Sequence, residues 1–235
     1  MKTRIILLSK KKLMMWLILI ALLVIFVLSL QMISVNTMNY YDPIYKGSED
    51  DKEIAFACNV VWGNEQLPEM LRILRENNIK ITFFIGGDWA TKYPEDLKAI
   101  QKEGHELGNH GENHKKQTLL NIEQNNREIL KAEESIKNVT GVKTTLFAPP
   151  YGDINKTVVE AAEKNGYKVI MWSIDTIDWN TKDYSQIIER VERKQHNGAI
   201  VLMHPKEVTV KALPEMINRL RNNGYKICTV SEVLE

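Results

Sequence analysis

The sequence predicts an α/β protein: a distorted (β/α) barrel of about seven parallel strands, preceded by one N-terminal transmembrane helix. Two observations predict the barrel. From residue 53 onward, short apolar segments rich in β-branched residues alternate with helical patterns, and glycine or proline stands at many of the joints. This alternation is typical of a parallel sheet covered by helices. Seven such repeats within about 180 residues fit a closed or nearly closed barrel better than an open sheet.

The third observation is an uninterrupted apolar run of 18 residues, 13–30, directly after three lysines at 10–12. About 20 apolar residues span a bilayer, and flanking lysines stay on the cytoplasmic side. A cleaved signal peptide usually has a shorter core of about 7–15 residues and a small-residue cleavage site, which the following residues lack. We therefore expect a cytoplasmic basic tail (1–12), an uncleaved anchor (13–30) in the cell membrane, and an extracytoplasmic remainder. A cleaved signal peptide and a buried helix are the alternatives.

Charge is divided unevenly along the chain. Residues 1–30 hold five of the 31 basic residues and no acidic one, which leaves 26 basic against 30 acidic residues in the remainder. A nucleic-acid-binding domain normally presents a basic face, so we expect no nucleic-acid partner. Residues 31–52 are polar and contain Pro43 and Gly47, which predicts a linker. Residues 53–235 are enough to bury the core of one domain.

The expected elements follow the linker in order. Strands are expected at 54–61, 80–86, 105–110, 145–150, 168–175, 199–204 and 225–230. Helices are expected near 66–78, 94–103, 121–138, 154–165, 183–196 and 210–222. Because the carboxyl ends of barrel strands meet at one face, polar residues at those ends should share one site.

The two cysteines lie in the first and last expected strands. Cys58 stands in IAFACNVV and Cys228 in YKICTV. Buried free thiols are the simpler expectation. First and last strands are neighbours in a closed barrel, so a disulfide is the alternative.

Histidines stand at the ends of two expected strands. His110 and His114 are four residues apart, and in a helix this spacing would place both imidazoles on one face as metal ligands. His204 ends the apolar strand AIVLMH, and Asp178 follows another strand. An aspartate can hold the tautomer of a histidine and raise its basicity. Helix capping for Asp178 and packing or solvent exposure for the histidines are the alternatives.

A rigid turn follows the fourth expected strand. Its sequence is Pro149, Pro150, Tyr151 and Gly152. Such a turn can aim backbone N–H groups at an oxyanion, although an ordinary strand-to-helix turn has the same composition.

Together and in this order, these motifs resemble the polysaccharide deacetylases, the NodB homology or carbohydrate esterase family 4 domain. The resemblance covers about residues 53–235 and includes ITFFIGGDWA with Pro94 and the segment EGHELGNHGENH. It implies a metal-dependent hydrolase that removes N-acetyl groups from an envelope glycan of the peptidoglycan type, built of GlcNAc or MurNAc units. An N-acetylated polysaccharide is then the partner, and no protein partner is indicated.

The resemblance also implies a role for each motif. A divalent ion, zinc or cobalt, would be held by His110, His114 and one aspartate. His204 would be the catalytic acid, and Asp178 would tune it. The backbone at Tyr151 would help to stabilise the oxyanion. The substrate groove would be lined by Trp179, Leu202 and Pro150.

Three positions depart from the family pattern. The first family motif, Thr-Phe-Asp-Asp-Gly, aligns with residues 57–61. The general base becomes Asn59, which cannot accept a proton from water at neutral pH, and the metal aspartate becomes Val60. The arginine that braces the base becomes Ala148. The base half of the site is therefore altered, whereas the acid half is intact.

A metal site that lacks its aspartate needs another third ligand. Glu65 follows the altered motif and is the nearest choice, with Glu112 and Asp88 as weaker ones. Glu65 could instead serve in the first turn of a helix, where the dipole favours an acid. A general base contributes about 10²–10⁴-fold, so its loss alone leaves some turnover, but metal activation of water is harder to replace.

Two functions therefore follow from the sequence. The first is a membrane-anchored, extracytoplasmic, metal-dependent glycan N-deacetylase, favoured by the intact histidines. The alternative is a catalytically impaired protein of the same fold that binds envelope glycan, favoured by Asn59, Val60 and Ala148.

Overall fold

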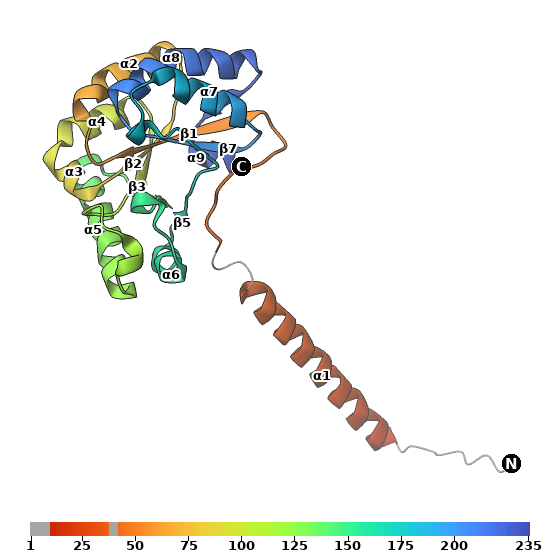
Figure 1. The fold of residues 1–235 in the computed structure, drawn as a ribbon. Helices are drawn as coiled ribbons and strands as arrows, with labels where there is room; N and C mark the ends of the chain where they lie inside the picture. Colours follow the sequence, from red (N-terminus) through yellow and green to blue (C-terminus); the bar gives the residue numbers. More distant parts are fainter. Residues whose placement is uncertain (1–9, 38–41) are drawn as a thin grey trace. The chain divides into compact units, whose positions relative to one another are not determined.

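The computed structural model describes residues 10–37 and 42–235, which belong to two separate compact units (Figure 1). Within the first unit the structure describes one helix, α1 (Lys10–Thr37). Its segment Lys10–Ser29 has a mean hydropathy of 2.6 and is long and apolar enough to cross a membrane, a test that a signal sequence also passes. Of the expected basic tail, residues 10–12 form the start of α1, and residues 1–9 lie outside the described part.

The second unit begins at Asp42, earlier than the boundary expected at residue 53. The Ile44 N–H donates to Val169 O at 2.8 Å, and Ile44 O accepts from Met171 N–H at 2.7 Å. Further on, the Gly47 N–H donates to Gly198 O at 2.7 Å. The linker expected at 31–52 is therefore wrong at both ends. Its residues 31–37 belong to α1, and the backbone groups of Ile44 and Gly47 are hydrogen-bonded within the second unit. Its residues 38–41 lie outside the described part.

The second unit is built on a curved, fully parallel sheet. Its strands are β1 (Glu53–Val60), β2 (Thr82–Ile85), β3 (Glu106–Asn109), β4 (Leu146–Phe147), β5 (Lys168–Val169), β6 (Ile174–Asp175), β7 (Ala199–Met203) and β8 (Lys226–Cys228). Seven strands follow the order β5-β4-β3-β2-β1-β7-β6, and β8 pairs with the first half of β1. The predicted distorted (β/α) barrel is confirmed.

The two edges of this sheet come from a single expected strand. β5 pairs with β4, whereas β6 pairs with β7 on the far side of the sheet. The segment 170–173 between them crosses the open side of the barrel, where Ile170 forms a parallel bridge to Ile44. The prediction of one strand at 168–175 is wrong because its two ends pair with different neighbours.

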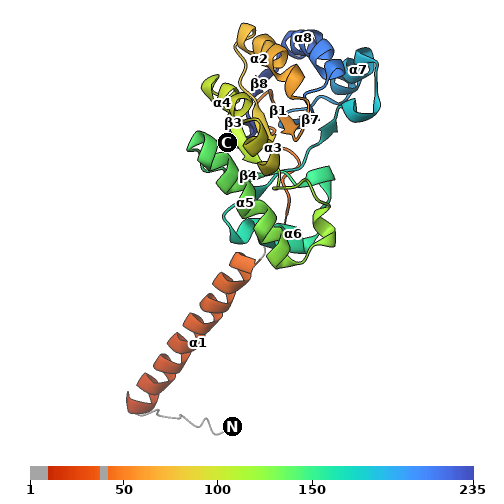
Figure 2. The same cartoon turned by 90° about the vertical axis from the view of Figure 1, so that its left-hand side faces the viewer.

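Helices pack around the outside of the sheet (Figures 1 and 2). They are α2 (Leu67–Glu76), α3 (Gly87–Lys92), α4 (Pro94–Lys102), α5 (Ile122–Thr140), α6 (Lys156–Lys164), α7 (Tyr184–Lys194) and α8 (Glu207–Asn222). The short α9 (Val230–Val233) instead packs Val230 and Val233 in the same core cluster as Ala55 and Ala57 of β1. Single 3₁₀ turns follow several strands: η1 (Asn64–Gln66), η2 (Gln117–Leu119), η3 (Pro150–Gly152) and η4 (Asp178–Asn180). Each amphipathic helix buries its apolar face; α2, for example, buries Met70 and Leu74.

The side-chain alternation of β1 orients the first motif. Residues of one face pack in the main core between sheet and helices, and they are Ile54, Phe56, Cys58 and Val60. Ala55 and Ala57 point the other way, into the small core inside the barrel. Because strand side chains alternate, Asn59 shares the inner face, and it lines the pocket described below.

The same alternation separates the cysteines. Cys58 and Cys228 are free and buried, and they belong to different core clusters. Burial raises the pKa of both thiols, that of Cys228 to about 12. The expectation of two buried free thiols is confirmed, and they are unreactive packing residues.

Candidate functional site

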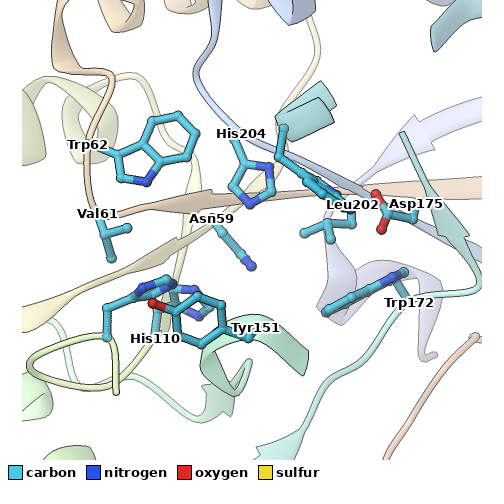
Figure 3. A pocket seen from close by; sticks show the side chains of 11 residues that line it. Asn59, Val61, Trp62, His110, Tyr151, Trp172, Asp175, Leu202 and His204 are labelled. Carbon is cyan, nitrogen blue, oxygen red and sulfur yellow. The ribbon is translucent and has the colours of Figure 1, made fainter. Parts of the chain in front are cut away.

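A pocket of about 410 Å³ opens at the carboxyl ends of the strands (Figure 3). Its lining residues are Asn59, Val61, Trp62, His110, His114, Tyr151, Trp172, Asp175, Trp179, Leu202 and His204. They come from the ends of β1, β3, β4, β6 and β7, from the loops that follow these strands, or, for Trp172, from the segment between β5 and β6. Parallel strands thus bring together residues that are far apart in the sequence, at the face where barrel sites lie.

His110 and His114 form one corner of this pocket, with ring centroids 5.1 Å apart. They are brought together without a helix, because the segment between them is a loop with positive φ at Gly111 (72°) and at His114 (50°). Nδ1 of His110 lies 2.7 Å from Ala148 O, and since a carbonyl only accepts, Nδ1 carries the proton. Nε2 of the neutral ring is therefore the nitrogen with a free lone pair.

Burial keeps His110 neutral. It lowers the pKa of His110 to about 3, with a smaller contribution from His114 nearby. Burial likewise lowers the pKa of His114, helped by His204. The His114 ring also lies against Tyr151, with the ring centroids 4.3 Å apart.

The loop that carries the histidines is held by a buried carboxylate. Glu128 on α5 accepts from the Asn113 N–H at 2.9 Å, from Asn113 Nδ2 at 3.0 Å and from Lys115 Nζ at 2.8 Å. Asn109 Oδ1 accepts from the Gly111 N–H at 2.8 Å. These bonds fix the strained loop, and nothing in the local sequence around Glu128 indicates that role, since it lies inside an ordinary helical pattern.

His204 and Asp178 form a second corner. His204 Nδ1 lies 2.7 Å from Asp178 Oδ1, and the His204 N–H donates to Asp178 Oδ2 at 2.7 Å. Thr209 on α8 donates its hydroxyl to the same Oδ2 at 2.6 Å. A carboxylate accepts the proton of Nδ1, so Nε2 of the neutral imidazole is the acceptor in the pocket. Asp178 is fully buried and does not cap α7, which Asp183 does instead.

Aromatic rings surround these polar groups. Trp62, Tyr151 and Trp179 are 41%, 61% and 56% exposed, and they offer flat apolar surface at the mouth of the pocket. Figure 3 shows Asn59 between His204 and Tyr151, with Trp172 and Asp175 on the far side. Trp62, Trp172 and Asp175 were not expected in the site from the sequence, although Asp175 ends an expected strand and Trp62 follows the altered motif.

The three expected groove residues have different positions. Leu202 lines the pocket, as does Trp179. Pro150 is buried and is absent from the lining; a Cβ on Gly111 would lie 3.5 Å from Pro150 Cγ. Pro150 therefore lies against the loop that carries the histidines. The next residue of η3, Tyr151, has a φ of 62° and lines the pocket.

Residues 46–170 match the family model of polysaccharide deacetylases. The chain belongs to the polysaccharide deacetylase family. It is 40% identical over 194 residues to the uncharacterized protein YlxY of Bacillus subtilis, which covers 83% of this chain and 61% of YlxY. It is 28% identical over 200 residues to a peptidoglycan-N-acetylglucosamine deacetylase of Bacillus cereus, covering 83% of this chain and 73% of that protein.

A solved structure is similar throughout the second unit. The crystal structure of a carbohydrate esterase family 4 pseudoenzyme from Bacillus anthracis superposes with a TM-score of 0.81 at 38% identity, covering 83% of this chain and 69% of that one. A mutant of that pseudoenzyme with restored enzymatic activity superposes with a TM-score of 0.81 at 36% identity, over 83% of this chain and 71% of that one.

The first family motif is altered in three dimensions as well as in sequence. Asn59 faces the pocket, and its Oδ1 is buried without a hydrogen-bond partner among the described residues. Val60, at the position where the resemblance implies the metal aspartate, points into the main core and is fully buried. Val61, one residue further, lines the pocket instead. Ala148 is buried inside the barrel, where an arginine would brace the base.

The residues present do not fit the metal of the family. No group of three or more His, Cys, Asp or Glu side chains that could hold a metal occurs within residues 10–37 and 42–235. Catalytic zinc is normally held by three protein ligands. The corner of the pocket at His110 and His114 offers two imidazoles, and His204 is bonded to Asp178 in the second corner. The donor set is therefore incomplete by one carboxylate.

The acidic residues suggested as third ligands lie elsewhere. Glu65 is exposed on η1, and the structure does not bring it to the histidines. Asp88 pairs with Lys92 at 2.7 Å on α3. Glu112 lies against Gly87 and accepts from Ser135 Oγ at 3.4 Å, and burial raises the pKa of its carboxyl.

Proposed function

We propose that this protein binds an N-acetylated envelope glycan of the peptidoglycan type in the pocket at the strand ends, with impaired hydrolysis. The observation that carries the proposal is the division of the pocket into an intact and an altered half. The aromatic walls and the pair His204–Asp178 are complete, whereas Asn59 replaces the base and Val60 leaves the histidine corner without a carboxylate.

The relatives support the same assignment. The Bacillus cereus relative is a peptidoglycan-N-acetylglucosamine deacetylase, and the Bacillus anthracis structure is a pseudoenzyme of this fold. Because a pseudoenzyme shares the fold of this chain, binding without turnover fits the residues found here. The catalytically impaired glycan-binding protein, which was the alternative from the sequence, is therefore favoured over the active deacetylase.

We further propose that α1 anchors the protein in the cell membrane as a single span. Its apolar segment is long enough to cross a bilayer, and Lys10–Lys12 precede it. By the positive-inside rule the lysines stay cytoplasmic, so the second unit faces the envelope where such a glycan is found.

The second candidate is a residual metal-dependent N-deacetylase. Two observations favour it: His110 presents a free Nε2, and His204 is oriented by Asp178. Zinc or cobalt would be held by His110 and His114 alone among the side chains that the structure describes. Such a site is expected to bind metal weakly, since a carboxylate ligand is missing.

The test measures by calorimetry how tightly the full-length protein, in detergent micelles, binds soluble glycan strands. N-acetylated strands are compared with de-N-acetylated ones. We expect saturable binding of the N-acetylated strands that Trp179→Ala weakens at least tenfold. The matched control is Tyr184→Ala, since Tyr184 is a 49% exposed aromatic residue on α7 outside the pocket lining. Equal binding by both variants, or no binding by the wild type, would contradict the proposal.

A further inference from the structure

A lysine stands at the mouth of the pocket between two of its tryptophans. Lys206 Nζ donates to the backbone oxygen of Trp179 at 3.4 Å. The same ammonium lies 5.8 Å from the ring centroid of Trp62, within the range of a cation–π contact. Lys206 therefore connects the loop after β1 with η4, two segments that are far apart in the sequence.

Trp62 in turn lies against the functional histidine. The rings of Trp62 and His204 are stacked, with centroids 5.3 Å apart and an interplanar angle of 17°. Trp62 and Trp179 both line the pocket, and both are about half exposed. A sugar bound beside His204 must therefore contact this group of Trp62, Trp179 and Lys206, which we call the Trp–Lys rim.

The charge of Lys206 is not neutralised by the protein. Within the part of the chain that the structure describes, no carboxylate lies within 4.0 Å of its ammonium. The nearest acidic residue in sequence, Glu207, pairs with Lys211. Asp178 is buried and bonded to His204 and Thr209, and Asp175 accepts from the Ile177 N–H at 2.7 Å. The ammonium thus keeps donor capacity directed at the pocket mouth.

We propose that the Trp–Lys rim selects a glycan with a carboxylate next to the sugar ring over a neutral one. The inference rests on the proposed function, since it names the class of glycan that the same pocket takes. The two indoles supply a flat apolar surface for a sugar, and Lys206 forms a charge-assisted hydrogen bond to a carboxylate substituent. A hexosamine whose ring carries a lactyl ether on one hydroxyl group has this chemistry, and an unsubstituted N-acetylglucosamine chain lacks it.

The experiment compares three tetrasaccharides against the full-length protein in detergent micelles. One carries free lactyl carboxylates, the second carries the same groups as methyl amides, and the third is the neutral N-acetylglucosamine oligomer. We expect the free acid to bind about tenfold more tightly than its amide, as for one charge-assisted hydrogen bond. Raising the salt concentration should reduce this preference, because the rim is exposed.

Variants assign the preference to one residue. Lys206→Met keeps the apolar stem and should abolish the preference for the acid, while Lys206→Arg should retain it. Lys211→Met is the matched control, because Lys211 is an exposed lysine on α8 that pairs with Glu207 and does not line the pocket. Equal affinity of the wild type for acid and amide, or a preference that survives Lys206→Met, would overturn the inference while leaving glycan binding intact. Failure of all three sugars to bind would instead contradict the proposed function.

Discussion

His204 makes two bonds of 2.7 Å to one carboxylate, through its ring Nδ1 and through its backbone N–H, and that carboxylate belongs to the fully buried Asp178. The two bonds fix both the ring orientation and the tautomer of His204. Thr209 completes the arrangement from α8. This half of the site is therefore as rigid as a working acid requires, although the opposite half has lost its base.

The first prediction concerns this pair. Asp178→Asn should destabilise the fold by about 2–3 kcal/mol, because a buried charged acceptor with three partners is replaced. Thr209→Val removes one of these bonds and should cost about 1 kcal/mol. Urea denaturation measures both values, and nitrogen chemical shifts of His204 report the tautomer. The Nδ1-protonated form should persist in Thr209→Val and become mixed in Asp178→Asn; unchanged shifts in Asp178→Asn would show that the carboxylate does not set the tautomer.

The second prediction concerns the altered motif. Alignment alone suggests restoring aspartate at 59 and 60, but Val60 is fully buried in the main core, whereas Val61 lines the pocket. Val60→Asp should therefore lower the free energy of unfolding by about 3–5 kcal/mol, the cost of an unpaired buried charge. Val61→Asp should cost less than about 1 kcal/mol. Denaturation of the two variants side by side decides the orientation, and a larger loss for Val61→Asp would contradict it.

The third prediction is weak metal binding by the unaltered chain. Two imidazoles without a carboxylate should bind zinc or cobalt well above micromolar dissociation constants, and His110→Ala should remove what binding there is. Val61→Asp adds a carboxylate to the same pocket and should tighten zinc binding at least tenfold. Calorimetry on the full-length protein measures this. Sub-micromolar zinc binding by the wild type, lost in His110→Ala, would show that a third ligand has been recruited.

The fourth prediction is a loss of stability at acidic pH. Burial lowers the pKa of His110 to about 3 and that of His105 to about 4, below the ordinary value of 6.5. Between those values the unfolded chain binds more protons than the folded one, so stability is complete above pH 6.5 and falls as the pH drops toward 3. His110→Gln should flatten this slope, measured by urea denaturation from pH 7 to 4. An unchanged slope would mean that His110 is not buried as a neutral ring.

Much of this site could be predicted from the sequence, because strand ends of a parallel barrel converge at one face. The order of His110, Tyr151, Asp178 and His204 along the chain therefore indicated a common pocket. The local geometry could not be predicted in the same way. The loop at His110–His114 depends on Glu128, which is remote from the motif and unremarkable in its helix.

The direction of a side chain at a strand end is equally hard to predict from the sequence. Matching the family motif residue by residue puts Val60 at the position of the metal ligand. Because side chains alternate along β1, Asn59 and Val61 line the pocket instead, and Val60 packs in the main core. Similarly, the segment 168–175 has the composition of one strand, and only pairing with β4 at one end and β7 at the other divides it. Such features follow from tertiary contacts, which periodicity does not encode.

Binding of N-acetylated glycan without hydrolysis is best tested by measuring bound glycan and released acetate together. The measurement uses the full-length protein in detergent with saturating N-acetylated peptidoglycan strands and added zinc. We predict saturable binding with acetate release no higher than that of His204→Ala. Acetate release that requires zinc and is abolished by His110→Ala and His204→Ala would contradict the account and establish a working deacetylase.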